Sequence, residues 1–398
     1  MNRKLKLAVF NTQPPHLYFG GVERRIIETA KLLVNEVDMT VYSGTKRGFN
    51  KTTVIDGTTF VPCFSTDKLY PLDNWVFNRS LSSMVVTIKA DIYEAHTVSG
   101  YGFLKVLKRR KIGKPFIQTI HGVLADEYIQ SSKSVSPSLR MKLSNVFMRH
   151  LARIEKEAAK EATLIVTVSK YSAQKIVQLY EVEETKIRIV PNGVDLQRFK
   201  PAEDCEKVKD IIAVNGEHVV IFVGNLIPRK GLHYLIEAAK QVIKENKDTK
   251  FVVVGDGPLK NHLISYSKEQ GVSDKFVFLG DVPEDMLHQL YSCADVFASP
   301  SIQEGQGISL LEAQATAKPV VAFNVSAINE VVKNNETGLL VKPDSYELAN
   351  AILSLLSDKS LREKMGRSGR EFVSQNFSWD ICAQKMLQIY SEASEHLV

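Results

Sequence analysis

The chain has 398 residues, of which 44% are hydrophobic and 24% charged, and it carries a formal net charge of +6. This length is too great for one ordinary core and suits two domains, and the composition is that of a soluble globular protein. The charge is uneven, because residues 1–200 hold 31 Lys and Arg against 18 Asp and Glu, whereas residues 201–398 hold 20 against 27.

The N-terminus carries only a short apolar run, Leu7 to Phe10, before Asn11. No signal-peptide core and no spanning segment are evident, so a cytoplasmic protein is expected. The cysteines are isolated, without the CxxC or Cys/His spacing of a zinc site or a disulfide framework. All four are interpreted as small apolar residues: Cys63, Cys205, Cys293 and Cys382.

The first half alternates apolar strands with helical segments. Leu5–Asn11 is an apolar run, followed by a loop to Gly20 and Gly21 and a helix from Val22 to Val34. The glycines lack the GxGxxG spacing of a dinucleotide site, so a loop that touches a ligand is the better interpretation. Further strands are predicted at 39–42, 91–94, 115–120 and 163–168, and helices at 102–110 and 137–161. This alternation predicts an open α/β sheet.

Much of the excess positive charge lies in two segments, residues 105–114 and 138–160. In the second, apolar residues from Leu139 to Leu151 alternate with Arg and Lys, which suits a helix resting on an anionic membrane surface. A solvated helix that packs its apolar stripe on its own domain fits the pattern equally well. Nucleic acid is less favoured, because no recognition motif accompanies the charge.

The domain joint is predicted near Pro191–Asp195, followed by a polar, irregular stretch to Val214. The strand and helix pattern then restarts and predicts a second α/β sheet. We expect an N-terminal domain over residues 1–195, a C-terminal domain over 196–378, and a last helix, about 379–398, that crosses back onto the first domain. Two such domains would face each other across a cleft at the carboxyl ends of their strands, where ligands of these folds bind.

The segment Ser299–Ala315 leaves a strand, turns on Gly305 and Gly307 and opens a helix. The glycines let the backbone approach a ligand, and the N–H groups at the helix start favour an anion such as phosphate. These N–H groups belong to Gly307, Ile308, Ser309 and Leu310. Two carboxylates, Glu304 and Glu312, frame this corner and could hold hydroxyls. An ordinary turn between strand and helix is the competing interpretation.

The loop Val223–Leu232 carries Arg229 and Lys230 just before a helix. Cations at a helix N-terminus oppose its dipole, which makes sense if an anion lies between them. A diphosphate shared with the Glu304 corner is the simplest account, although two basic residues on an exposed loop are also common. No Asp-x-Asp motif appears, so we predict that these cations replace a metal ion and that no metal site exists.

Three further positions follow predicted strands. Gly255 and Val282 lie in turns on the rim that would hold a nucleotide, and a purely structural role is favoured for both. His121 follows the strand at 116–120 and precedes Gly122. A structural histidine and a ligand contact are equally supported there.

In combination these motifs resemble the retaining glycosyltransferases of family 4, which have the GT-B architecture of two doubly wound parallel-sheet domains. The resemblance runs over nearly the full chain and includes the family's E-x7-E signature, Glu304 to Glu312. The other matching segments are Gly20–Gly21, Thr119–Gly122, Val190–Asp195, Val223–Gly231 and Gly255–Pro258.

The resemblance implies transfer of a sugar from a nucleotide-diphosphate sugar to an acceptor hydroxyl, with retention of anomeric configuration. It assigns Glu304 to the sugar hydroxyls and Glu312 to the ribose hydroxyls. It assigns Arg229 and Lys230 to the diphosphate, with backbone amides from Gly305 to Leu310. His121 would contact the sugar, and Gly20 and Gly21 would lie near the diphosphate and acceptor.

One residue departs from the family pattern. Members often carry Arg at the position of Asn225, which has no charge, so Arg229 would compensate or the diphosphate would be held less tightly. No cofactor beyond the nucleotide sugar is expected, and a UDP-sugar is favoured over GDP-mannose. A lipid-linked acceptor at the cytoplasmic membrane face is the first hypothesis and a soluble acceptor or glycan the second. A sugar-nucleotide epimerase and a non-catalytic sugar-binding protein remain the alternative functions.

Overall fold

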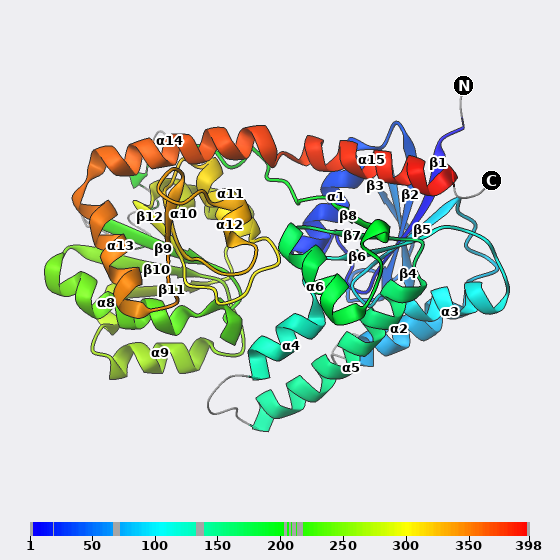
Figure 1. The fold of residues 1–398 in the computed structure, drawn as a ribbon, viewed down its shortest axis with the longest axis horizontal. Helices are drawn as coiled ribbons and strands as arrows, with labels where there is room; N and C mark the ends of the chain where they lie inside the picture. Colours follow the sequence, from blue (N-terminus) through cyan, green and yellow to red (C-terminus); the bar gives the residue numbers. More distant parts are fainter. Residues whose placement is uncertain are drawn as a thin grey trace. The chain divides into compact units, whose positions relative to one another are not determined.

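The computed structural model describes residues 3–18, 20–66, 72–132, 139–202, 205, 206, 208, 212 and 218–395, without the side chains of 139–145. The chain divides into two compact units, Met1–Asn192 with Trp379–Val398, and Gly193–Ser378. Each unit is built on one sheet with helices on both faces (Figure 1). The expected fold class, two doubly wound α/β domains, is confirmed.

The sheet of the first unit has the order β3-β4-β2-β1-β5-β6-β7-β8, and only the pair β3 and β4 is antiparallel. Its strands are β1 (Leu5–Asn11), β2 (Val37–Gly44), β3 (Thr53–Ile55), β4 (Thr58–Cys63), β5 (Ile92–His96), β6 (Phe116–Ile120), β7 (Leu164–Thr167) and β8 (Ile187–Ile189). Its helices are α1 (Gly21–Leu32), α2 (Leu72–Ser83), α3 (Tyr101–Arg109), α4 (Leu124–Ser132), α5 (Leu139–Glu161), α6 (Lys170–Tyr180) and α15 (Trp379–Glu395), with a short helix η1 (Glu184–Lys186).

Two apolar clusters cover the two faces of this sheet. One joins the strands to α2 and α3 through residues such as Phe77 and Phe103. The other joins them to α1 and α15 through Ile26, Met386 and Ile389. A strand that is covered on both faces usually has a continuous apolar sequence. All five residues of β5 are buried in this way. Because that strand includes Glu94 and His96, two ionisable side chains are buried within the sheet.

The sheet of the second unit is entirely parallel, with the order β11-β10-β9-β12-β13-β14. Its strands are β9 (His218–Val223), β10 (Thr249–Val254), β11 (Phe276–Gly280), β12 (Val296–Ser299), β13 (Val320–Phe323) and β14 (Gly338–Val341). Its helices are α8 (Leu232–Glu245), α9 (Lys260–Glu269), α10 (Glu284–Cys293), α11 (Ile308–Ala315), α12 (Ile328–Val331), α13 (Ser345–Ser357) and α14 (Lys359–Asn376), with short helices η2 (Pro228–Lys230) and η3 (Ser273–Lys275). The strand order reverses between β9 and β12, and in open α/β sheets ligands bind at such a switch point.

The hairpin of β3 and β4 has no counterpart among the predicted elements. Its turn residues, Asp56 and Gly57, both have positive φ, at 46° and 77°. Asp-Gly between two strands is a strong hairpin signal, because a type I′ turn requires positive φ at both central positions. The edge strand β3 is short and its Val54 is 65% exposed, so the sequence there has no apolar run that would predict a strand.

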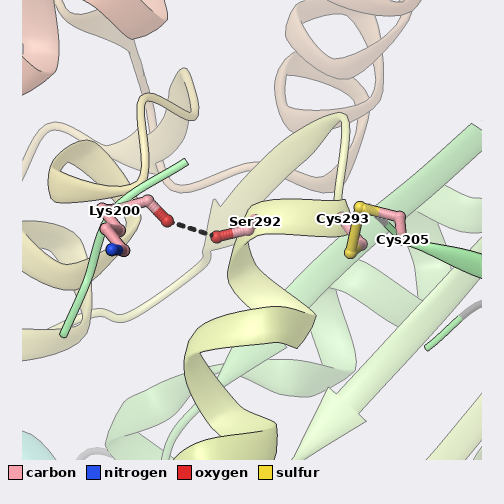
Figure 2. The surroundings of a disulfide bond; sticks show 4 residues. All are labelled: Lys200, Cys205, Ser292 and Cys293. Atoms are coloured by element: carbon pink, nitrogen blue, oxygen red, sulfur yellow. Dashed lines mark hydrogen bonds between the residues drawn. A yellow bond between two sulfur atoms is a disulfide. The ribbon is translucent and has the colours of Figure 1, made fainter. Parts of the chain in front are cut away.

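The interpretation of all four cysteines as small apolar residues is wrong for two of them. Cys205 and Cys293 form a disulfide with 5.5 Å between their Cα atoms, and Ser292 beside it donates a hydrogen bond to the Lys200 carbonyl at 2.8 Å (Figure 2). The partners lie 88 residues apart in sequence. No local spacing could reveal this pair, because folding alone brings the thiols within bonding distance. Cys63 and Cys382 are free and buried.

Helix α5 contains the basic segment for which a membrane-surface helix and a helix packed on its own domain were predicted equally. The amphipathic pattern predicted for Leu139 to Leu151 falls partly outside the described side chains. Among those that are described, Val146 is 66% and Phe147 44% exposed, whereas Leu151 is buried. Within the part of the chain that the structure describes, no helix is both long and apolar enough to span a bilayer.

Candidate functional site

Two loops meet at the switch point of the second unit. One follows β9 and contains η2, and the other follows β12. Gly231, with φ of 64°, lies so close to the second loop that a Cβ atom there would come within 2.0 Å of the Pro300 carbonyl oxygen. The Arg229 carbonyl accepts a hydrogen bond from the Ile302 N–H at 2.8 Å. Glycine at this position therefore permits a contact that fixes the two loops together.

This contact assembles a charged cluster around Glu304, which is 5% exposed. The Lys230 ammonium forms an ion pair with Oε1 of Glu304, and the Arg229 guanidinium lies 3.3 Å from Oε2. Ser301 donates a hydrogen bond to Oε1 at 2.8 Å, and the Glu304 N–H donates to Ser326 Oγ at 2.9 Å. The cluster is thus held by both side-chain and backbone contacts.

Burial favours the neutral form of Glu304, but Lys230 and Arg229 outweigh that effect and lower the pKa of its carboxyl. The carboxylate is therefore ionised near neutral pH, and it faces two cations. A pair of cations against one anion leaves a net positive charge at the loop. This partial neutralisation also explains why two basic residues are tolerated just before the start of α8.

The loop after β12 ends in the N-terminus of α11. Gly307 caps this helix in the left-handed region, with φ of 87° and ψ of 76°. Gly305, Ile308 and Ser309 are half-buried around it, whereas Leu310 is buried and its N–H donates to the Gly307 carbonyl at 3.0 Å. The Leu310 N–H, predicted to be a free donor, is therefore already engaged in the first turn. The N–H groups that precede it at the helix start lack acceptors four residues back and suit an anion.

Glu312 lies in the same helix and is 4% exposed. Tyr291, from α10, donates a hydrogen bond from its hydroxyl to Oε2 of Glu312 at 2.8 Å. The sequence reasoning missed Tyr291, because an isolated Tyr in a helix carries no signal until the packing of α10 on α11 is known. The hydroxyl orients the Glu312 carboxylate inside an otherwise apolar cluster.

The remaining predicted positions of this unit lie at the ends of β9, β10 and β11. Gly255, with φ of 119°, packs so tightly that a Cβ atom would lie 2.3 Å from the Gly224 carbonyl oxygen. Its N–H donates to the Gly280 carbonyl at 2.8 Å. These contacts give Gly255 a structural role at the rim. Asn225 is exposed in the neighbouring loop, and Val282 is half-buried after β11.

In the first unit, Gly20 caps α1 and Gly21 begins it. The Arg24 N–H donates to the Gly20 carbonyl at 2.9 Å, and Asn11 at the end of β1 donates to the Glu23 carboxylate at 3.1 Å. Burial raises the pKa of Glu23. The two glycines therefore lie at the carboxyl end of β1, where the sheet order reverses toward β5.

His121 lies one residue beyond β6 and stacks on His96, the last residue of β5, with ring centroids 5.2 Å apart. Nε2 of His121 and Nδ1 of His96 are 2.9 Å apart and share a hydrogen bond. The sequence reasoning missed His96, although both histidines end apolar runs. Their proximity depends on β5 and β6 being neighbours in the sheet. Among the described residues, no group of three or more His, Cys, Asp or Glu side chains could hold a metal ion.

The chain matches two family models that follow the two units. Residues 19–198 match the model described as Glycosyltransferase Family 4, and residues 205–372 match that described as Glycosyl transferases group 1. An uncharacterised glycosyltransferase of Methanocaldococcus jannaschii is 30% identical over 290 residues, covering 71% of this chain and 70% of the relative. The chain belongs to the group 1 glycosyltransferases.

Two other relatives of this glycosyltransferase carry more specific names. The UDP-Gal:alpha-D-GlcNAc-diphosphoundecaprenol alpha-1,3-galactosyltransferase of Escherichia coli is 29% identical over 403 residues, covering 97% of both chains. A GDP-mannose-dependent alpha-(1-6)-phosphatidylinositol monomannoside mannosyltransferase of Mycobacterium tuberculosis is 32% identical over 236 residues, covering 57% of this chain and 61% of the relative.

The solved structure of sucrose-phosphate synthase from Thermosynechococcus elongatus superposes with a TM-score of 0.83 at 20% identity, covering 98% of this chain and 99% of that one. At this identity the similarity bears on the fold, which is GT-B. The predicted family and architecture are confirmed. The glycosyltransferase is a hexosyltransferase, and enzymes of its family use nucleotide-sugar donors.

Proposed function

We propose that this glycosyltransferase transfers a hexose from a UDP-sugar to a hydroxyl of a lipid-linked acceptor, retaining the anomeric configuration and without a divalent ion. The observation that carries the proposal is the cluster of Lys230, Arg229 and Glu304 at the switch point between β9 and β12. It combines a net positive charge with a helix N-terminus, which suits a diphosphate.

In this proposal Lys230 and Arg229 bind the diphosphate together with backbone amides from Gly305 to Ser309, because the Leu310 N–H is already engaged by the Gly307 carbonyl. Negative charge accumulates on the diphosphate as the glycosidic bond breaks, and preorganised cations stabilise that charge. The same role is often taken by a metal ion, and the two side chains would supply the equivalent charge. Asn225 could donate one further hydrogen bond.

The carboxylates would bind hydroxyls on either side of the diphosphate. Glu304 is ionised and would accept hydrogen bonds from the sugar, and Glu312 would accept them from the ribose. Gly255 and Val282 would border the nucleotide. In the first unit we propose that His121 contacts the sugar and that the backbone at Gly20 and Gly21 lies near the diphosphate and the acceptor. The acceptor proton would pass to a donor phosphate oxygen, so no protein base is assigned.

A UDP-sugar is the preferred donor because a relative that covers almost the whole chain is named for UDP-Gal. The GDP-mannose-dependent relative covers a smaller share. The same full-length relative is named for a diphosphoundecaprenol acceptor, which supports a lipid-linked acceptor here. We further propose that the protein works at the cytoplasmic face of a membrane, to which the basic surface of the first unit binds.

The test combines binding with turnover. Thermal shift is measured with UDP, GDP, UDP-glucose, UDP-galactose, UDP-N-acetylglucosamine and GDP-mannose, because a ligand of the folded state raises the midpoint. Turnover is then followed as nucleotide release with polyprenyl-diphosphate sugars, with and without EDTA. We expect selective stabilisation by uridine nucleotides, EDTA-resistant turnover and a product with the donor's anomeric configuration. Loss of turnover in EDTA, an inverted product, or epimerised sugar nucleotide without acceptor product would each overturn the corresponding part.

A further inference from the structure

The carboxyl ends of β5 and β6 carry a series of hydrogen-bonded polar side chains, of which the proposed reaction uses only His121. His96 and Thr119 are paired in register across the two strands, and His121 follows two residues later. Glu94 precedes His96 by two residues on β5, so the two side chains share one face of the sheet. Glu94 and His96 are each about 2% exposed.

Both oxygens of Glu94 are engaged. Oε1 accepts a hydrogen bond from Thr119 at 2.6 Å and lies 3.5 Å from Nε2 of His96. Oε2 accepts from the Tyr390 hydroxyl, on α15, at 2.5 Å. Because two hydroxyls donate to its oxygens, the Glu94 carboxyl is fixed with Oε1 facing the His96 ring.

The buried cation Arg25 lies beside these hydrogen-bonded side chains. Arg25, 1% exposed, borders the same small cavity as Glu94, His96 and Tyr390. Its guanidinium donates to the Val190 carbonyl at 2.8 Å and to Asn192 at 3.1 Å. Its positive charge opposes protonation of the imidazoles. Burial is the largest cause and lowers the pKa of His96 to about 4, although Glu94 acts in the opposite direction and more strongly than Arg25. Burial, then His96 and then Arg25, lower the pKa of His121 well below its ordinary value.

A neutral imidazole has one N–H and one bare nitrogen, and the partner of one nitrogen decides the state of the other. Oε1 of Glu94 lies 3.5 Å from Nε2 of His96, and a carboxyl oxygen there favours a proton on Nε2, which leaves Nδ1 of His96 to accept. The hydrogen bond between the rings is then donated by Nε2 of His121. Nδ1 of His121 is left bare, and it is buried without a hydrogen-bond partner within the described part of the chain.

We propose that Glu94 and His96 are positioning residues that hold His121 in its Nε2–H tautomer, so that its Nδ1 accepts a hydrogen bond from a hydroxyl of the bound sugar. The last part of this inference rests on the proposed transferase function, whereas the tautomer does not. A bare nitrogen suits a hydroxyl donor and not a phosphate oxygen, which offers only lone pairs near neutral pH. The hydrogen bonds from Glu94 to His121 therefore suit His121 to sugar recognition, and the phosphates are left to Lys230 and Arg229.

The test compares two replacements of His96 in the full chain. In His96→Asn the side-chain amide oxygen can take the place of Nδ1 and accept from His121, whereas His96→Leu has similar bulk but no acceptor. Ring-nitrogen protonation is read by ¹⁵N NMR, and His121→Gln identifies the His121 signals among the nine histidines. His262→Gln, at an exposed position on α9, is the control that shows how the spectrum changes when a histidine elsewhere is removed.

We expect the wild type and His96→Asn to show His121 protonated on Nε2, and His96→Leu to show a mixture of tautomers. The loss of one neutral hydrogen bond corresponds to about 3- to 10-fold in kcat/KM, which is the decrease expected for His96→Leu. The substrate is UDP-glucose or whichever tested UDP-sugar is turned over. His96→Asn should recover most of the lost kcat/KM. A wild-type His121 protonated on Nδ1, or an unchanged spectrum in a folded His96→Leu, would overturn the inference. Absent turnover with the expected spectrum would instead count against the transferase function alone. If His96→Leu fails to fold, Glu94→Gln gives the same comparison, because a reoriented amide can donate to His96 and reverse the tautomers.

Discussion

The carboxylate of Glu304 shows how one buried residue can organise the side chains of a candidate site. It is buried, yet Lys230 and Arg229 keep it ionised, and Ser301 fixes one of its oxygens. In return the carboxylate holds both cations in place for the proposed diphosphate. A preorganised cation costs little reorganisation when charge develops on a leaving group. The cluster therefore links the stability of the loop to the proposed chemistry.

Replacing Lys230 with Ala should lower turnover because one charge-assisted contact to the leaving diphosphate is lost. Such a contact contributes about 1.5–3 kcal/mol, which corresponds to about 10- to 150-fold in kcat if it forms fully in the transition state. The measurement is nucleotide release at saturating donor. Lys240→Ala, an exposed lysine of α8 that contacts Gln270, is the matched control and should leave kcat unchanged. Equal turnover of Lys230→Ala and wild type would remove the proposed role of the cluster.

At the scale of elements, α4, α5 and α6 are joined by one buried carboxyl. Glu155 of α5 accepts a hydrogen bond from the Leu124 N–H at 3.0 Å, at the start of α4, and one from the Tyr180 hydroxyl of α6. Burial raises its pKa to about 8, although both hydrogen bonds act in the opposite direction and Glu127 adds repulsion. Glu155 thus stays protonated in the folded protein at pH values where the unfolded chain ionises it.

The stability contributed by protonated Glu155 is fully present below about pH 4.5 and is lost as pH rises to about 8. Glu155→Gln is neutral at every pH and keeps an acceptor oxygen. We expect the free energy of unfolding of Glu155→Gln minus that of the wild type to increase as pH rises through this window, by on the order of 4 kcal/mol in total. Denaturant unfolding at pH 5, 7 and 9 measures the difference. Glu157→Gln, exposed on the same helix, should show no such trend, and a flat difference for Glu155→Gln would show that the carboxyl is ionised when folded.

At the scale of the whole molecule, the two halves of the chain differ in charge, with an excess of basic residues in the first 200 and of acidic residues in the rest. On α3 and just beyond it this excess is exposed, at Lys105, Lys108, Arg109, Arg110 and Lys111. Helix α5, which packs on α3, adds exposed Val146, Phe147 and Arg149. Basic side chains beside exposed apolar ones suit the surface of an anionic bilayer.

Vesicles containing phosphatidylglycerol should therefore sediment the protein at low salt, and less of it as ionic strength rises. Each basic residue near the surface contributes about 1 kcal/mol, so Lys108→Gln with Arg109→Gln should weaken partitioning about 30-fold. The matched control replaces two exposed lysines of the second unit, Lys244 and Lys268, with Gln. Equal losses in both double variants would indicate a general charge effect, and binding indifferent to salt would contradict the proposed surface.

The sequence alone determined the local order of the protein. Apolar runs of strand length alternating with amphipathic helices specified two doubly wound sheets, because strands covered on both faces must be apolar throughout. It also placed Glu304, Gly307 and Glu312 around the start of one helix, since the distance between residues so close in sequence is set by backbone geometry. The hairpin at Asp56 and Gly57 was missed although its turn signal was present.

Only the tertiary structure decided which strand ends are neighbours. Lys230 reaches Glu304 across 74 residues because β9 and β12 are adjacent, and Tyr390 reaches Glu94 across 296 because α15 packs on the first sheet. The pairing of His96 with His121 and the Cys205–Cys293 disulfide have the same origin. Strand order and helix docking follow from burying whole apolar faces, a property of the entire chain that no single segment encodes.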